Sequence, residues 1–201
     1  PEEMKGITYL KFRSNGDLWI GTRNGLNVYR RSVTRWTSIQ LPEPDMRNNI
    51  NEVIQTRDGN IWLGTGEGVT IIQPNGTLRF VTEIEHSPIL IVTGLAEDSE
   101  GNVWVSSGSS FNGAYRWDGK EWTHFNIVSD SGFPIHKIRL DKRGRLWFLG
   151  LGSGDMLMSE NRPGAYCLEN GTFTRWGEKE GLLNGRVYAF AESNDSALCF
   201  G

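Results

Sequence analysis

The chain has 201 residues, and its 21 Lys and Arg residues against 24 Asp and Glu residues give a net charge of −3 at pH 7. Nucleic-acid-binding domains carry a basic face, and attachment to anionic lipid needs a polybasic cluster, so we expect neither nucleic acid nor membrane as a partner of this chain. No apolar run approaches the ~20 residues that span a bilayer. The two cysteines, Cys167 and Cys199, are too few to predict a disulfide framework.

A phrase of about nine residues recurs along the chain. The tryptophans of its four complete copies are 43, 42 and 43 residues apart, and a period of about 40–45 residues is typical of a four-stranded propeller blade. The copies are SNGDLWIGT at 14–22, RDGNIWLGT at 57–65, SEGNVWVSS at 99–107, KRGRLWFLG at 142–150 and a degraded fifth, NDSALCFG, at 194–201.

The first repeat shows the elements that we expect in every copy. Apolar residues at Ile7 and Leu10 predict a first strand, and a polar turn then ends at Gly16, where glycine tolerates the positive φ of a hairpin turn. The run LWIG is apolar on both faces, as in a strand buried between two sheets. A third strand opens after Gly25, and a fourth ends at an aromatic residue, Trp36.

The later repeats follow the same order, with the aromatic residue of the fourth strand at Phe80, Phe125 and Trp176. No stretch shows a sustained 3.6-residue period with caps, so no long helix is predicted. We therefore predict an all-β fold, a β-propeller of four-stranded antiparallel blades, with about four and a half blades in this chain. The predicted partial propeller covers 1–201, with blades at about 5–40, 48–84, 90–127 and 133–177 and half a blade at 185–201.

The phrase DGNIWLGT, with a hydrophobic strand before it and an aromatic strand after it, closely resembles the two-component regulator propeller repeat. The resemblance covers four complete repeats and half of a fifth, in which Ser196 and Cys199 replace glycine and tryptophan. It implies that the tryptophans fill the gaps between blades. Because the family usually closes with seven blades, we expect the chain to be a piece of a longer propeller or to pair with another chain.

Variation among the repeats is confined to one face of the predicted propeller. From the phrase tryptophan to the next strand-opening glycine the copies span 6, 6, 9 and 17 residues, so insertion falls in the loop between second and third strands. The connection between blades also varies, and in an up-and-down blade both loops emerge on the same face. Binding sites tend to lie on variable loops held by a rigid scaffold.

The resemblance implies that the first strand lines the central axis, so its first residues form a rim on that face. Each of these residues also has the simpler interpretation of a solvated loop residue. The ligand-binding candidates are Asn51, Thr93, His136 and Tyr188 on the rim, and Arg23, Arg47, Glu67, Asp155 and Arg186 in nearby loops.

Catalytic chemistry is not predicted. None of the three histidines has a second histidine or a cysteine at metal-ligand spacing, and we expect no metal, no cofactor and no catalytic residue. His136 alone lies on the proposed rim, where it is a candidate for binding or proton transfer because histidine titrates near neutral pH.

The resemblance implies an extracytoplasmic sensory module of a bacterial hybrid histidine kinase-like protein, on the periplasmic or extracellular face of the membrane. Its partners would be a small-molecule or saccharide ligand and a second copy in a homodimer, with any catalysis in an effector domain elsewhere. Two alternatives stay open. Streptogramin lyases use a related propeller with a metal and a histidine at its mouth, to which His136 and Glu67 could correspond. The chain could also be a protein-interaction scaffold.

Overall fold

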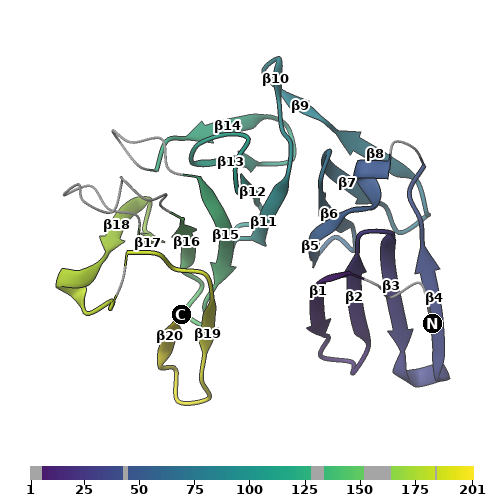
Figure 1. The fold of residues 1–201 in the computed structure, drawn as a ribbon, viewed down its shortest axis with the longest axis horizontal. Helices are drawn as coiled ribbons and strands as arrows, with labels where there is room; N and C mark the ends of the chain where they lie inside the picture. The colour runs from purple at the N-terminus through teal and green to yellow at the C-terminus, as the bar shows by residue number, and fades with distance from the viewer. Residues whose placement is uncertain (1–5, 43–44, 128–133, 152–163, 184) are drawn as a thin grey trace. The chain divides into compact units, whose positions relative to one another are not determined.

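The computed structural model describes residues 6–42, 45–127, 134–151, 164–183 and 185–201 (Figure 1). The chain divides into two compact units, Pro1–Val92 and Thr93–Gly201. Regular structure in the described residues consists of β-strands and short 3-10 turns, and four sheets are four-stranded antiparallel meanders. The predicted all-β class and its blade-like sheets are therefore confirmed.

The first unit holds two four-stranded sheets in which successive strands pair. A 3-10 turn, η2 (Arg31–Val33), joins the last two strands of the first sheet, and η3 (Asp45–Asn48) precedes the second sheet. The strands are β1 (Ile7–Phe12), β2 (Leu18–Thr22), β3 (Gly25–Arg30) and β4 (Arg35–Ile39), then β5 (Ile50–Gln55), β6 (Ile61–Thr65), β7 (Gly68–Ile72) and β8 (Leu78–Val81), and a ribbon of β9 (Glu83–Ile84) and β10 (Ser87–Pro88).

The second unit holds two further four-stranded sheets and a two-stranded sheet. The 3-10 turn η5 (Glu178–Glu180) lies between the last four-stranded sheet and the pair. The strands are β11 (Val92–Glu97), β12 (Val103–Ser107), β13 (Ala114–Trp117) and β14 (Trp122–Phe125), then β15 (Ile135–Leu140), β16 (Leu146–Gly150), β17 (Ala165–Glu169) and β18 (Thr172–Trp176), and finally β19 (Phe190–Glu192) and β20 (Leu198–Phe200).

The turn between the first and second strands has the predicted conformation in each four-stranded sheet. Its glycine, at positions 16, 59, 101 and 144, has φ between 81° and 93°, the left-handed region that glycine enters without steric cost. Ser196 takes the equivalent position in the last pair with φ 63°, although a residue with a Cβ pays for this conformation. The turn geometry thus survives the degraded fifth phrase.

The phrase tryptophans are buried between neighbouring sheets. Trp19 shares a core with Val53 of the second sheet, and Trp104 shares one with Phe148 of the fourth sheet. Trp147 packs against the last pair of strands. These three placements confirm that the tryptophan column fills the gap between a blade and the blade that follows it.

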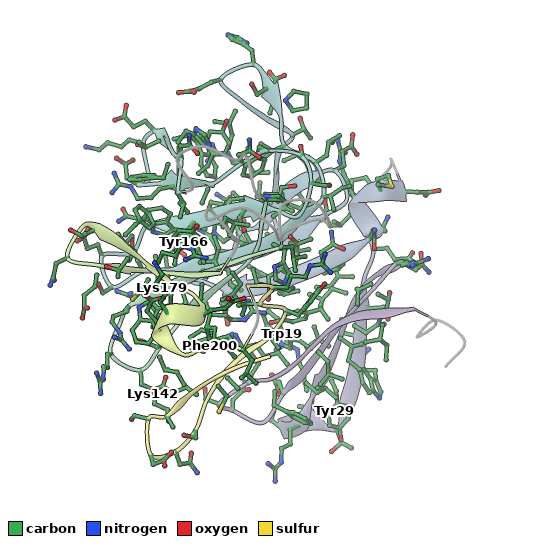
Figure 2. All side chains as sticks on the ribbon, turned by 60° about the vertical axis from the view of Figure 1, so that its left-hand side comes forward. Trp19, Tyr29, Lys142, Tyr166, Lys179 and Phe200 are labelled. Atoms are coloured by element: carbon green, nitrogen blue, oxygen red, sulfur yellow. The ribbon has the colours of Figure 1, made fainter. Side chains whose placement is uncertain are left out.

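The two faces of the fourth sheet belong to different cores, and Figure 2 labels one residue of each, Tyr166 and Phe200. Tyr166 of β17 packs with Trp104 on one face. Phe200 of β20 meets Trp147 on the other, with ring centroids 5.2 Å apart. Strands that are apolar on both faces therefore serve two cores, as the sequence pattern predicted.

The expected aromatic column of the fourth strand is wrong in the first two sheets. Phe125 and Trp176 lie opposite the residue that follows the glycine before or at the start of the third strand, Ala114 and Ala165. In the first sheet that register position belongs to Ile39, in the second to Val81, whereas Trp36 pairs with Tyr29 near the hairpin turn. Hairpin register is determined by the turn, so spacing counted from a glycine did not predict it.

Candidate functional site

Three first strands carry a β-bulge at the predicted rim position. The register shifts around Asn51 between β5 and β6, around His136 between β15 and β16, and around Thr8 between β1 and β2. A bulge leaves one residue outside the ladder and turns its side chain in a new direction. The rim column is therefore distinguished by backbone geometry, which the sequence did not reveal.

In the first unit, the structure brings together two of the predicted residues. Arg47 of η3 and Glu67 of the β6–β7 turn form an ion pair, with Nε and Oε2 3.5 Å apart, and the Arg47 guanidinium lies 4.3 Å from the centre of the Phe80 ring. The side-chain nitrogen of Asn51 is buried and has no hydrogen-bond partner among the described residues. Arg23 lies exposed in the β2–β3 turn.

In the second unit, Thr93 of β11 and His136 of β15 both lie near Gly108. A Cβ at Gly108 would stand 3.4 Å from the Thr93 hydroxyl and 3.8 Å from the His136 Cβ. The Thr93 hydroxyl is buried without a hydrogen-bond partner in the described part of the chain. Gly108 was not among the predicted residues, and only the longer loop after SEGNVWVSS pointed to it.

His136 of β15 contacts β16 through one ring nitrogen and the segment before β19 through the other. Nδ1 lies 3.0 Å from the Leu149 carbonyl oxygen and Nε2 lies 3.2 Å from the Tyr188 carbonyl oxygen. A neutral imidazole donates to only one of these carbonyls. Burial lowers the pKa of His136, the two carbonyls raise it, and Lys137 and Arg139 lower it, for a net decrease. The neutral form is thus favoured.

Arg186 and Tyr188 line a separate cleft of about 670 Å³ together with apolar residues such as Leu182 and Phe200. The cleft borders β20, which has no strand on its other side among the described residues, whereas each second strand of a complete sheet pairs with a third. The bulged positions hold buried polar groups in each unit, at Asn51 in the first and His136 in the second, so we take each as a candidate site. Asp155, the remaining predicted residue, lies outside the described residues.

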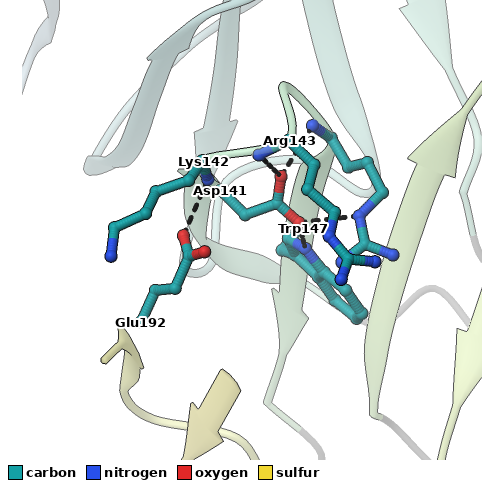
Figure 3. Close-up of polar contacts among 6 residues, drawn as sticks. Asp141, Lys142, Arg143, Trp147 and Glu192 are labelled. Atoms are coloured by element: carbon teal, nitrogen blue, oxygen red, sulfur yellow. Dashed lines mark hydrogen bonds and ion pairs between the residues drawn. The ribbon is translucent and has the colours of Figure 1, made fainter. Parts of the chain in front are cut away.

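At the turn between the first and second strands, which is the end opposite the rim, aspartates accept hydrogen bonds from the phrase tryptophans. Asp141 accepts hydrogen bonds from the indole Nε1 of Trp147 at 2.9 Å and from Nε of Arg145 at 2.7 Å (Figure 3). The adjacent Lys142 backbone N–H donates to Glu192 at 2.7 Å. These contacts fix the β15–β16 turn and tie it to the β19–β20 pair.

The third sheet repeats this arrangement, in which Asp98 accepts from the Trp104 indole at 2.9 Å. Burial raises the pKa of Asp98 and of Asp141, but hydrogen bonds from the indole, from neighbouring side chains and from backbone N–H groups outweigh it and hold each pKa below the usual range. Both aspartates are therefore ionised structural acceptors.

Within the described residues, no group of three His, Cys, Asp or Glu side chains is arranged to hold a metal ion. The same part of the chain holds no helix that is long and apolar enough to cross a membrane.

Residues 46–67, from η3 to the β6–β7 turn, match the family model described as the two component regulator propeller. The family resemblance predicted from the repeated phrase is thereby confirmed at its second copy. Among curated proteins, no sequence matches the chain.

Solved structures share the fold along almost the whole chain. The extracellular domain of a hybrid two component system from B. thetaiotaomicron is 22% identical with a TM-score of 0.74, covering 97% of this chain and 26% of that one. Virginiamycin B lyase from Staphylococcus aureus, in a structure with quinupristin, is 17% identical with a TM-score of 0.71, covering 98% and 64%. PorZ, a surface component of the type-IX secretion system of Porphyromonas gingivalis, is 17% identical with a TM-score of 0.63, covering 94% and 29%.

These identities establish a shared propeller fold and no more. The chain spans about a quarter of the B. thetaiotaomicron domain and under two thirds of the lyase. Extracellular domains of signalling systems and a lyase both share this fold, so the fold by itself does not separate sensing from catalysis.

Proposed function

We propose that this chain is part of a sensory, ligand-binding propeller of a bacterial two-component signalling protein, held on the periplasmic or extracellular side of the membrane. The family match at residues 46–67 and the fold shared with an extracellular domain of a hybrid two component system support this function. The observation that carries the ligand-binding part is the pair of buried, partnerless polar atoms at equivalent positions, Asn51 Nδ2 and Thr93 Oγ1.

A buried polar group without a partner costs about 1–3 kcal/mol, and such groups in native structures indicate an unfilled role for water or a ligand. The Asn51 amide and the Arg47 guanidinium in the first unit suit a ligand rich in hydroxyl groups, and so does the Thr93 hydroxyl in the second unit. We therefore favour a saccharide, bound at the rim of a propeller that signals as a homodimer.

Calorimetric titration of the chain with a panel of neutral oligosaccharides tests this function. We expect saturable binding to at least one, weakened about tenfold or more by Asn51→Ala or Thr93→Val, since each removes a hydrogen-bonding group from a desolvated site. Asn75→Ala is the matched control, because Asn75 is exposed in the β7–β8 turn at the other end of the strands. If no saccharide binds, or if binding survives both rim variants, the proposal fails.

The fold shared with virginiamycin B lyase supports a second candidate, an enzyme that acts on a streptogramin-type substrate. Here His136, the histidine at the bulge of β15, would be the acid or base. Incubation with quinupristin decides between the two: turnover that requires a divalent metal and disappears in His136→Ala supports the enzyme, and unchanged quinupristin excludes this substrate.

A further inference from the structure

One position of the third strand breaks the pattern of the repeats. The residue paired with the phrase tryptophan is buried and apolar in three sheets, with 4% of its surface exposed in each. In the β13 strand the same position holds an arginine. The pairs are Trp19–Val28, Trp62–Ile71, Trp104–Arg116 and Trp147–Cys167.

Arg116 is half-buried, and its guanidinium lies beside two aromatic rings. Its guanidinium carbon lies 5.3 Å from the centre of the Phe125 ring and 6.0 Å from that of Trp104. Its Nε is buried without a hydrogen-bond partner among the described residues, and no ion pair to Arg116 occurs in that part of the chain. The exposed Asp118 interacts with Arg116 through its charge. The Nε–H is still without an acceptor, and since an unpaired buried donor costs about 1–3 kcal/mol, an anion that reached it would be stabilised.

A cleft of about 340 Å³ opens at this arginine, between the turns of the third and fourth sheets. Trp104, Leu146 and Leu168 contribute apolar wall. Glu100 and Glu169, both exposed, lie in its lining. The volume is within the usual range of small-ligand pockets, and the cleft lies at the opposite ends of the strands from Thr93 and His136.

Two other charged groups of the cleft, Asp98 and Arg145, already have partners. Asp98 accepts from the Trp104 indole and from Asn102, and Arg145 is paired with Asp141 at 2.7 Å. The exposed Arg143 lines the cleft as well, so its lining offers positive charge at Arg116 and Arg143 and negative charge at Glu100 and Glu169.

We propose that this cleft binds a small zwitterion of the amino-acid class, with its carboxylate on Arg116 and its ammonium group near Glu100 and Glu169. A guanidinium presents parallel N–H donors that match a carboxylate. An anion without the ammonium group would meet the glutamates unfavourably. The site is independent of the rim, so its test does not depend on the proposed sensing function.

Nuclear magnetic resonance of the whole 201-residue chain tests the site with three probes: L-alanine, L-alanine methyl ester and acetate. We expect L-alanine to shift the Arg116 Nε–H and Trp104 indole N–H resonances saturably. Acetate should bind about fivefold more weakly, since exposed ion pairs contribute little. The methyl ester, which lacks the carboxylate, should not bind.

Arg116→Ile, which restores the residue type of the second sheet, should abolish the L-alanine shift of the Trp104 indole. Arg30→Ile, at an exposed position of β3, is the control and should leave it unchanged. Arg116→Lys keeps the positive charge but lacks the planar guanidinium, so this variant should bind L-alanine more weakly than the wild type. It provides a second test if Arg116→Ile does not fold. The proposal is overturned if no probe gives a saturable shift in the wild type, or if Arg116→Ile retains it.

Discussion

Two tryptophans at the same place in the repeat have different surroundings. Trp19 lies in the core between the first and second sheets, and Trp104 lies in the core between the third and fourth sheets. Trp19 is surrounded mainly by aliphatic residues such as Val53 and Leu63, and the Arg13 guanidinium lies 4.8 Å from the centre of its ring. Trp104 instead meets Phe125 at 4.8 Å and Phe148 at 5.3 Å between ring centroids.

The polar end of the tryptophan differs as well. Six residues before each phrase tryptophan the chain has Arg13 in the first sheet and Asp98 in the third, and only the aspartate accepts the indole N–H. The repeat thus determines that the tryptophan ring is buried between two sheets, while the residues around the ring determine how strongly its contacts stabilise the core. The following predictions test this difference.

Trp104→Ala should give the largest effect. Removing a fully buried tryptophan costs ~3–5 kcal/mol, and Tm should fall by about 2–4 °C for each kcal/mol in a chain of this size. Trp19→Ala should fall at the lower end, because small aliphatic neighbours collapse into the space more readily than rings. Trp36→Ala is the control, since 42% of Trp36 is exposed. Equal losses at all three positions would contradict a seam role for the column.

Asp98→Ala should come next. It leaves the Trp104 indole N–H without its acceptor and should cost about 1–3 kcal/mol in urea unfolding. Arg13→Ala removes only a cation–π contact and should cost ~0.5–1 kcal/mol. If Arg13→Ala proved the more harmful, the aspartate would not be what holds the third-sheet tryptophan more firmly.

Gly94→Ala should destabilise the third sheet through a contact that the first unit avoids. A Cβ at Gly94 would stand 2.2 Å from the Ser106 hydroxyl and 3.0 Å from the Ile138 backbone nitrogen, and overpacking of this kind costs about 1–3 kcal/mol. In the second sheet the corresponding pair is Glu52 and Gly64, so there the large side chain is on the first strand and the glycine is on the second. Adding Ser106→Gly should therefore recover part of the loss, and strictly additive losses in the double variant would argue against the size exchange.

The smallest effect concerns pH. Because burial lowers the pKa of His136, the unfolded chain binds this proton more readily than the folded one. Stability from neutral His136 should be complete above about pH 6.5 and should be lost as pH falls through the lower folded-state pKa. Urea midpoints at pH 7.5 and 5.5 should therefore differ more in the wild type than in His136→Gln. His124→Gln, at an exposed position, should behave as the wild type.

Much of the fold followed from periodicity. The repeat of the phrase predicted the strand order, the turn glycines and the tryptophan seams, because each of these depends on residues close in sequence. The aromatic column failed at Trp36, because hairpin register depends on turn geometry. Three positions of the predicted rim column, Thr8, Asn51 and His136, lie at β-bulges. The sequence did not predict these bulges, because a bulge depends on how two strands pair.

The sequence alone determined the all-β class, the repeat and the family, since turns and alternating apolar residues are local features that specify a four-stranded blade at any position in the chain. Tertiary structure decided the rest: which side each tryptophan faces, that Thr93 and His136 both lie near Gly108, and that Arg116 stands where other sheets place an apolar side chain. Those facts depend on contacts between residues far apart in the chain, and packing between blades decides them.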